Sequence, residues 1–399
     1  MEAVATAAER GVTPVATRIL LVASRASGGM ARHVIALLGG LRGEGYRLAV
    51  ACDPEGLIAE AARERDLPLY PITFSGSASP TRAMLAAWQL SGAIAGFQAH
   101  LVHTHSYHAG LVGAVSTPLA RPARMVATMH GYPPYSKDGQ ALGSSGRLAV
   151  RLILRRAARV ILVSEALRRD LLPLRPEASG KMTVIPNGVE VRSEPKLSPA
   201  EARAQYGLPP DVPLIGLVAR LAPQKGLLEF LRSVRLICDR RPEVHAVVVG
   251  HGPLRGEGED LARALGLTDR VHWLGQLESA REAMWALDVL VVASVSEGSS
   301  LVAMEGMSLG KAVVATSVGG VPEVVVDGET GAVVPPADPE AMAEAVLAML
   351  ADPISAQAMG DRGRQRAAQQ FDLELMIERT KKVYADLMRE LKEGSRARK

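Results

Sequence analysis

The chain has 399 residues, of which 48% are hydrophobic and 4% aromatic, and its formal net charge is +4 at pH 7. This length favours two domains over one, with cores built mainly from Ala, Val and Leu. The charge is too small to indicate a nucleic acid as partner, although it permits an anionic ligand or an anionic membrane surface. The sequence has no run of about 18 apolar residues, so we expect no membrane-spanning segment.

Residues 1–17 contain several charges and no apolar core, which predicts a disordered tail and not a signal peptide. The two cysteines, Cys52 and Cys238, lie in different predicted domains and lack the spacing of metal ligands. We interpret both as small buried hydrophobic residues of a protein from a reducing compartment. A cytoplasmic location is therefore expected.

Apolar strands and helical patterns alternate along residues 18–195, which we interpret as an N-terminal domain. Its expected strands are Arg18–Ala23, Arg47–Cys52, Leu69–Phe74, His100–His105, Arg124–His130, Arg159–Ser164 and Met182–Pro186. Such alternation predicts a mostly parallel sheet with helices on both faces. After Asn187 the sequence becomes polar and rich in proline, which is typical of a domain boundary or linker.

A second alternating series occupies residues 196–370, the predicted C-terminal domain. Its expected strands are Leu214–Arg220, His245–Gly250, Val271–Gly275, Asp288–Ala293, Lys311–Thr316 and Gly331–Val334. Helical stretches close the chain, the last of them at about residues 371–399. The fold class is thus α/β, with two Rossmann-like, doubly wound domains in series and a cleft between them.

Glycines follow the first strand of the N-terminal domain, and a histidine ends a later one. Gly28 and Gly29 would let the backbone approach an anion at a helix start, or they form an ordinary tight turn. His130 would project into the cleft from the end of its strand, or it is a structural histidine.

Cations and glycines mark the strand ends of the C-terminal domain. Arg220 and Lys225 follow its first strand, where they could clamp a diphosphate, or they are solvated surface charges. Gly250 and Gly252 form a glycine-rich loop at the end of the next strand.

The most informative stretch runs from residue 293 to residue 320, where strand, polar turn, helix and strand follow one another. Glu297 lies on the turn, and Glu305 lies eight residues later, inside the helix. The right-handed crossover places both at the carboxyl edge of the sheet, where open α/β sheets bind ligands. Free N–H groups at the helix start suit a phosphate, and the carboxylates suit sugar or ribose hydroxyls. This set predicts a site for a phosphorylated sugar.

The cluster of His103, His105 and His108 suggests zinc at first reading. His103 and His105 alternate on one strand, however, and neither a carboxylate nor a cysteine accompanies them. We therefore expect no metal here, and interpret these residues as structural or as contacts to carbohydrate or phosphate.

Taken together, these segments resemble the retaining GT-B glycosyltransferases of family 4, also called glycosyl transferases group 1, over nearly the whole chain after the tail. The E-x7-E pattern of Glu297 and Glu305 is the most specific piece. The surrounding segments agree in order and spacing: VIPNGVE at 184–190, GLVARLAPQKG at 216–226, VVVGHGPL at 247–254, VHWLGQ at 271–276 and SVGGVPEVV at 317–325. The resemblance implies a last helix that crosses back onto the first domain.

The resemblance also implies a role for each matching residue. Arg220 and Lys225 would bind the donor diphosphate and stabilise it as it leaves. Glu305 would hold the ribose hydroxyls, and Glu297 would contact the transferred sugar. No metal cofactor is implied, because the two cations supply the positive charge.

Backbone groups complete the implied donor site. The N–H groups of Ser299, Ser300 and Leu301 would meet the phosphates, with Gly29 near the β-phosphate and His130 near the donor sugar. The family often has a bulky apolar residue and Gly or Pro where this chain has Ser299 and Ser300, which affects the choice of sugar more than phosphate binding.

The implied function is transfer of a sugar from a nucleotide-diphosphate sugar, UDP before GDP, to an acceptor such as a lipid-linked or cell-envelope glycan. A GT-B sugar-nucleotide epimerase and a non-catalytic sugar-nucleotide-binding protein are the alternatives. Retention of configuration would follow from a front-face mechanism, because no nucleophilic carboxylate is evident on the first domain.

A basic helix that begins near Arg147 suggests that the protein makes peripheral contact with the anionic inner face of the cell membrane. Arg147, Arg151 and Arg155 recur on one helical face, with Arg156 and Arg159 extending it. Leu148, Leu152 and Ile153 would supply apolar surface. The alternative is a solvated basic face on a helix packed against its own domain.

Overall fold

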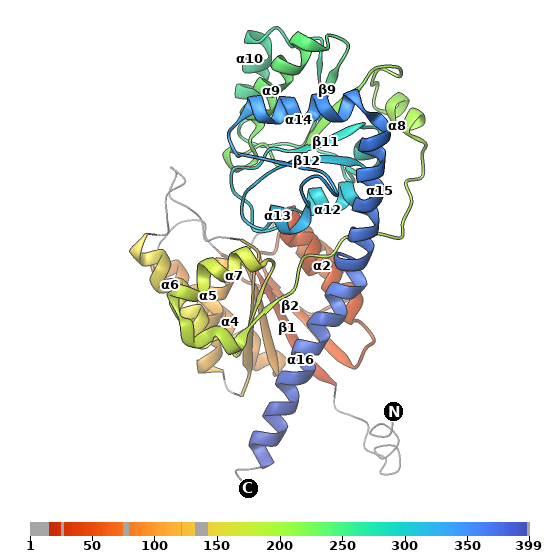
Figure 1. The fold of residues 1–399 in the computed structure, drawn as a ribbon. Helices are drawn as coiled ribbons and strands as arrows, with labels where there is room; N and C mark the ends of the chain where they lie inside the picture. The colour runs from red at the N-terminus through yellow and green to blue at the C-terminus, as the bar shows by residue number, and fades with distance from the viewer. Residues whose placement is uncertain (1–15, 25–27, 75–79, 121, 132–142, 397–399) are drawn as a thin grey trace.

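The computed structural model describes residues 16–24, 28–74, 80–120, 122–131 and 143–396. Two α/β lobes are stacked on one another, and a long C-terminal helix runs down from the upper lobe along the lower one (Figure 1). Most of the predicted tail, residues 1–15, lies outside the described residues. Of the described helices, none combines the length and apolar character needed to cross a bilayer.

In the described part of the chain, the N-terminal lobe contains a seven-stranded sheet in the order β3-β2-β1-β4-β5-β6-β7, and every strand pair is parallel. The strands are β1 (Thr17–Ala23), β2 (Tyr46–Cys52), β3 (Leu69–Pro71), β4 (Leu101–His105), β5 (Arg124–Met129), β6 (Arg159–Leu162) and β7 (Met182–Val184). The helices between them are α2 (Gly29–Leu41), α3 (Leu57–Arg63), α4 (Pro80–Phe97), α5 (Tyr107–Ser116), α6 (Ser144–Arg156) and α7 (Glu165–Leu171).

The described residues of the C-terminal lobe form a six-stranded parallel sheet in the order β10-β9-β8-β11-β12-β13. Its strands are β8 (Leu214–Val218), β9 (His245–Val249), β10 (Val271–Gly275), β11 (Val289–Val292), β12 (Ala312–Thr316) and β13 (Ala332–Val334). Its helices are α8 (Pro199–Gln205), α9 (Leu227–Arg240), α10 (Arg255–Ala264), α11 (Arg281–Trp285), α12 (Leu301–Ser308), α13 (Val321–Val324), α14 (Pro339–Ala351) and α15 (Pro353–Gln370).

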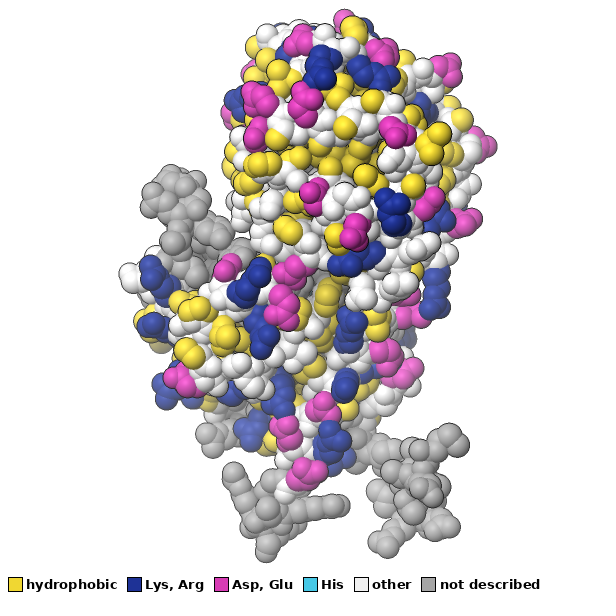
Figure 2. Space-filling model, viewed as in Figure 1, with side chains coloured by type: hydrophobic (Ala, Val, Ile, Leu, Met, Phe, Trp, Pro, Cys, Tyr) yellow, Lys and Arg dark blue, Asp and Glu magenta, His cyan; other side chains and the backbone are white. Residues whose placement is uncertain are grey.

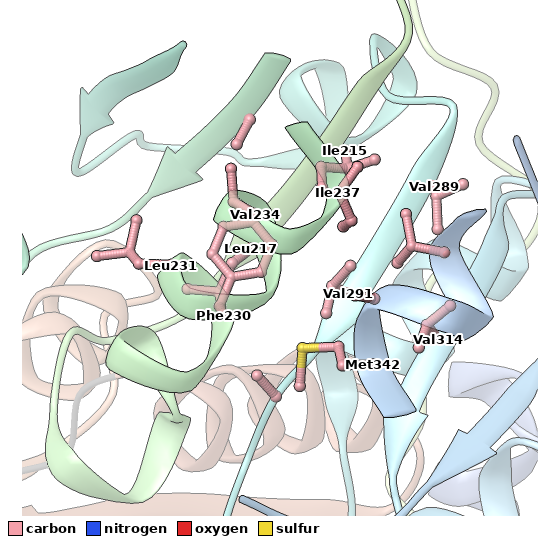
Figure 3. Close-up of a cluster of buried hydrophobic side chains, with 14 of the residues drawn as sticks. Ile215, Leu217, Phe230, Leu231, Val234, Ile237, Val289, Val291, Val314 and Met342 are labelled. Carbon is pink, nitrogen blue, oxygen red and sulfur yellow. The ribbon is translucent and has the colours of Figure 1, made fainter. Parts of the chain in front are cut away.

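The strands of the upper lobe are apolar on both faces because helices cover both. Side chains alternate along a strand, so Ile215 and Leu217 enter one core, while Leu214 enters the other. Figure 3 shows the first of these cores, where Phe230 and Val234 of α9 point toward the strand residues. The two cores fix the sheet between its helical layers and hold the strand ends in place.

The last helix, α16 (Leu373–Arg396), crosses back to the N-terminal lobe, as predicted. Its buried side chains Met376, Ile377, Tyr384 and Leu387 belong to the core that contains α2 and α3. The linker runs beside the start of this helix, because Val189 donates to the Phe371 carbonyl at 2.8 Å and accepts from the Leu373 amide at 3.0 Å. The predicted doubly wound α/β fold with a returning C-terminal helix is confirmed.

The polar segment after Asn187 contains one element that the sequence analysis missed. Helix α8 begins with a capping box, in which the Ser198 hydroxyl accepts the Glu201 amide and the Glu201 carboxylate accepts the Ser198 amide. This Ser-x-x-Glu pattern is a helix-start signal that can be recognised in the sequence.

Candidate active site

A cavity of about 1200 Å³ lies between the two lobes, and every residue predicted for the site lines it. The N-terminal lobe contributes Gly28, Gly29 and His130, and the C-terminal lobe contributes Arg220, Lys225, Gly250, Gly252, Glu297, Ser299, Ser300, Leu301 and Glu305. The structure therefore brings together residues from strand ends and helix starts throughout the chain.

Strand order explains why the groups of the C-terminal lobe converge. The chain continues from β8 to β9 on one side and returns to β11 on the other, so the sheet has its topological switch point between β8 and β11. Lys225 follows β8 and Glu297 follows β11, which places them on the two sides of this crevice. Open α/β sheets bind ligands at such a point.

Lys225 and Glu297 form an ion pair within the cavity. The Lys225 Nζ atom lies 2.5 Å from Glu297 Oε2, and the two side chains are 29% and 12% exposed. Arg220 is more exposed and lines the same wall. A ligand phosphate could pair with the Lys225 ammonium group, and a sugar hydroxyl could donate a hydrogen bond to the Glu297 carboxylate.

Glu305 lies inside α12 and faces the opposite lobe. Arg32 of α2, in the N-terminal lobe, donates a hydrogen bond to its carboxylate, so this ion pair bridges the two lobes across the cavity. The two residues are 273 positions apart in the sequence. Burial raises the pKa of Glu305, and the neighbouring Arg32 guanidinium opposes that shift. Arg32 was missed in the sequence, although its place one helical turn after Gly28 was a signal for a cation facing the cleft.

The start of α12 is shaped to receive an anion. Ser300 is its N-cap, and the Ser300 hydroxyl accepts the Ala303 amide at 3.3 Å. The amides of a first helical turn have no acceptor within the helix, and the positive end of the helix dipole adds to their effect. Ser299 and Ser300 are buried, and Leu301 lies against Gly29 of the other lobe. All three residues of the predicted phosphate contact line the cavity.

Three buried histidines, His33, His103 and His105, lie behind the N-terminal wall, and half-buried His130 lies on it. His105 Nδ1 lies 3.2 Å from His130 Nε2, and His33 Nδ1 lies 3.1 Å from the Asn187 side-chain oxygen. Burial lowers the pKa of His33 to about 4, against the effect of its hydrogen bond to Asn187, and lowers those of His105 and His130 well below the usual range. These side chains are therefore neutral at physiological pH.

His103 is part of the supporting structure and lies deeper than the cavity wall. Its ring is hydrogen-bonded to the Tyr384 hydroxyl of α16 on one side and to Thr128 on the other. Burial, and next the neighbouring His33, lowers the pKa of His103 to about 3. His108 is exposed on α5 and contacts Tyr107. The three histidines of the HTHSYH segment therefore do not act as a unit.

His33, His105 and His130 are the described residues that could hold a metal ion, because one ring nitrogen from each lies within 4.8 Å of the others. Tetrahedral zinc, with bonds of about 2.0–2.1 Å, requires nitrogens about 3.4 Å apart, so the rings would have to move inward. Two of the rings already share the hydrogen bond between His105 and His130. The arrangement fits a set of neutral hydrogen-bonded imidazoles.

Family models match both halves of the chain. Residues 27–193 match the model described as Glycosyltransferase Family 4, and residues 199–366 match the model described as Glycosyl transferases group 1. The boundary between the two matches falls in the linker.

Curated relatives cover most of the chain. A D-inositol 3-phosphate glycosyltransferase of Streptomyces avermitilis is 32% identical over 351 residues, covering 82% of this chain and 72% of the relative. An alpha-maltose-1-phosphate synthase of Mycobacterium tuberculosis is 31% identical over 334 residues, covering 77% and 84%.

Solved structures share the fold along nearly the full chain. The Anabaena protein HepE in complex with UDP and glucose has a TM-score of 0.81 at 22% identity, covering 93% of this chain and 100% of that one. A sucrose-phosphate synthase from Thermosynechococcus elongatus has a TM-score of 0.79 at 25% identity, covering 94% and 100%.

Proposed function

This chain belongs to the GT-B glycosyl transferases of group 1, and we propose that it moves a sugar from a UDP-sugar to an acceptor with retention at the anomeric carbon. One curated relative is named a glycosyltransferase and the other a synthase, which favours transfer over epimerisation or silent binding. The choice of UDP over GDP is supported by the UDP and glucose bound in the Anabaena neighbour.

One observation carries this proposal: Lys225, Glu297, Glu305 and the start of α12 meet at the switch point of the C-terminal sheet. The diphosphate would lie on the α12 amides with Lys225 and Arg220 beside it. The Glu305 carboxylate would release the Arg32 guanidinium and accept hydrogen bonds from the ribose hydroxyls instead. The donor sugar would then lie between Glu297 and the opposite lobe.

The chemistry follows from where charge develops. As the anomeric bond breaks, negative charge grows on the leaving diphosphate, and Arg220, Lys225 and the helix dipole stabilise it. Among the described residues, the N-terminal wall of the cavity contains no Asp or Glu to act as a nucleophile. A front-face reaction, in which the departing phosphate takes the acceptor proton, would give retention without a covalent intermediate. We propose that this reaction needs no metal, because the two cations carry the charge.

A membrane contact on the N-terminal lobe would suit an acceptor held in a lipid layer. On α6, Arg147, Arg151 and Arg155 are exposed and Leu148 is 68% exposed. Helix α4, which like α6 packs against α5, adds the apolar side chain of Trp88, which is 74% exposed. Figure 2 shows Lys and Arg side chains gathered over the α6 and α7 region, with hydrophobic side chains among them. Basic and apolar groups on one surface are what binding to anionic lipid requires.

The structure corrects two details of the expected membrane face. Arg159 does not extend it, because this residue begins β6 and its guanidinium pairs with Glu390 of α16. Ile153 is fully buried in the core beneath α6, so it supplies no surface. The proposed contact in the cytoplasm therefore involves the outer face of α6 and the exposed Trp88 of α4.

The function is tested by a panel of nucleotide sugars, read first as thermal shifts and then as turnover. We expect UDP-glucose or another UDP-sugar to raise the melting temperature, and GDP-sugars to have a smaller effect. Release of UDP should accelerate when sugar phosphates, cyclitol phosphates or lipid-linked glycans are added as acceptors. A protein that no nucleotide sugar stabilises, or a product with inverted configuration, would overturn the proposal.

A further inference from the structure

Glu323 lies on α13 in the C-terminal lobe, but its carboxylate binds a helix of the N-terminal lobe. One oxygen accepts the backbone N–H of Glu165 at 2.8 Å, and the other accepts that of Ala166 at 2.6 Å. These two residues begin α7, and they are more than 150 positions from Glu323 in the sequence. α13 lies at the junction of the lobes, directly above the N-terminal lobe (Figure 1).

The contact satisfies groups that helix geometry leaves unpaired. The first N–H groups of an α-helix have no acceptor within the helix and lie at its positive end. The Ser164 hydroxyl accepts the third of them, from Leu167, at 3.2 Å. Glu323 supplies the remaining acceptors from the other lobe, so the N-terminus of α7 is fully capped only while the lobes are together.

The backbone around Glu323 is held firmly within its own lobe. Arg366 of α15 donates to the Glu323 carbonyl at 2.7 Å and to the Val324 carbonyl at 3.1 Å. Any movement of Glu323 relative to α7 therefore requires movement of the lobe, since a guanidinium fixes the main chain of α13 to a long helix.

Two glycines connect this contact to the active site. A Cβ at Gly320 would lie 2.5 Å from Ser164 Cβ and 2.4 Å from the Gly298 carbonyl oxygen. A Cβ at Gly298 would lie 2.4 Å from the His130 carbonyl oxygen. Such approaches exclude a side chain at either glycine. The turn before α13 therefore packs closely on Ser164 at the start of α7 and on the backbone of the loop after Glu297, which in turn packs on the backbone at the end of β5.

We propose that Glu323 is a positioning residue that closes the cleft by capping α7 and thereby holds Glu297 opposite His130. The inference rests on the proposed function, in which these two residues face the donor sugar. Glu323 does not line the cavity, so it acts through the alignment of the lobes and not through contact with substrate. Alignment of reacting groups contributes strongly to rate, and small displacements are costly.

Hydrogen exchange measures the contact directly, with no need for a known acceptor. In Glu323→Ala, the amides of Glu165 and Ala166 should exchange about tenfold faster or more, and Glu323→Gln should give a smaller effect. Glu329→Ala is the matched control, because it removes an exposed carboxylate from the same segment. Unchanged exchange at the start of α7 in Glu323→Ala would overturn the proposal.

Two further readouts separate alignment from a general loss of stability and from failure of the proposed function. UDP affinity should be largely retained in both Glu323 variants, because most of the proposed UDP contacts come from the C-terminal lobe, whereas UDP-sugar turnover should fall about tenfold or more. Small-angle scattering should show a larger radius of gyration for Glu323→Ala. If Glu323→Ala showed faster exchange at the start of α7 but turned over UDP-sugar at the wild-type rate, the positioning role would be refuted. If the wild-type protein had no affinity for UDP, the proposed function would be refuted, but the exchange result would still show the contact.

Discussion

Lys225 and Arg220 are the cations of the proposed donor site, and their effect should fall mainly on the leaving group. Replacing either by Ala should lower turnover on the order of 10²-fold, which corresponds to about 3 kcal/mol of transition-state stabilisation. Both line the cavity and neither belongs to the hydrophobic core, so the fold should survive. Steady-state rates of UDP release at saturating donor measure this effect.

Arg232→Ala is the matched control for these variants. Arg232 is a half-exposed cation on α9, in the same lobe, and it does not line the cavity. Its loss should leave turnover near the wild-type value. Near-normal turnover in Lys225→Ala or Arg220→Ala would contradict the assignment of the diphosphate clamp.

Glu305 should act on the ribose and therefore on every uridine nucleotide. Glu305→Gln keeps the shape and removes the charge, so UDP should bind more weakly by about 1–3 kcal/mol. Calorimetric titration with UDP and with the intact UDP-sugar should show the same loss. If only the intact donor bound more weakly, Glu305 would be the sugar contact, and the roles of Glu297 and Glu305 would be exchanged.

Local spacing identified the cavity residues that lie near one another in sequence, such as Glu297 and Glu305. It did not identify Arg32 or Glu323, because the partner of each comes from the other lobe. Arg32 is 273 positions from Glu305, and no pattern along the chain reports that distance. Pairs of residues from different lobes can be identified only once the three-dimensional fold is known.

The buried histidines on α2 and β4 make the N-terminal lobe sensitive to acid. His33 and His103 have pKa values of about 4 and about 3, below the ordinary value of 6.5. Below about pH 6.5 these histidines bind protons in the unfolded chain but stay neutral in the folded chain. The free energy of unfolding that they contribute at neutral pH is therefore lost as the pH falls. At about pH 5 the loss should reach about 2 kcal/mol for His33 alone.

Urea titrations between about pH 7.5 and about pH 5 test this expectation. The slope of unfolding free energy against pH should be smaller in His33→Asn than in wild type, by up to about 1.4 kcal/mol per pH unit. Equal slopes in wild type and His33→Asn would show that His33 is not held neutral by burial.

Helix α6 carries the membrane prediction. The triple variant Arg147→Glu, Arg151→Glu and Arg155→Glu should lose binding to anionic vesicles in co-sedimentation, and wild-type binding should fade at high salt. Equal charge reversal at Arg232, Arg240 and Arg263 in the C-terminal lobe provides the matched control, since these side chains are exposed on α9 and α10. No wild-type binding to anionic vesicles at low salt would end the proposal.

Strands were easier to predict than short helices. All the predicted strands occur, because runs of apolar residues bounded by turns are a strong local signal. Most are shorter than predicted by one to three residues, β1 and β2 each begin one residue earlier, and β10 has its predicted bounds. Helix α8 was missed because its polar, proline-rich surroundings resemble a linker. The capping box of Ser198 and Glu201 is the local signal that indicates this helix.

The arrangement of the whole molecule depends on contacts that the sequence does not display. The resemblance to a family implied the return of α16, but only the structure shows that Tyr384 of this helix reaches the ring of His103 behind the active site. The last helix thus connects the chain terminus to the histidines of the N-terminal wall.

The cleft as a nucleotide-sugar site is the central claim, and a crystal structure of the protein with UDP-glucose tests it most directly. We predict that the diphosphate lies on the α12 amides beside Lys225 and Arg220, with the ribose on Glu305 and the sugar between Glu297 and His130. Arg32 should have released Glu305, and the Glu323 contact with α7 should remain. A nucleotide bound elsewhere, or in this cavity with its ribose away from Glu305 and its phosphates away from α12, would contradict the account.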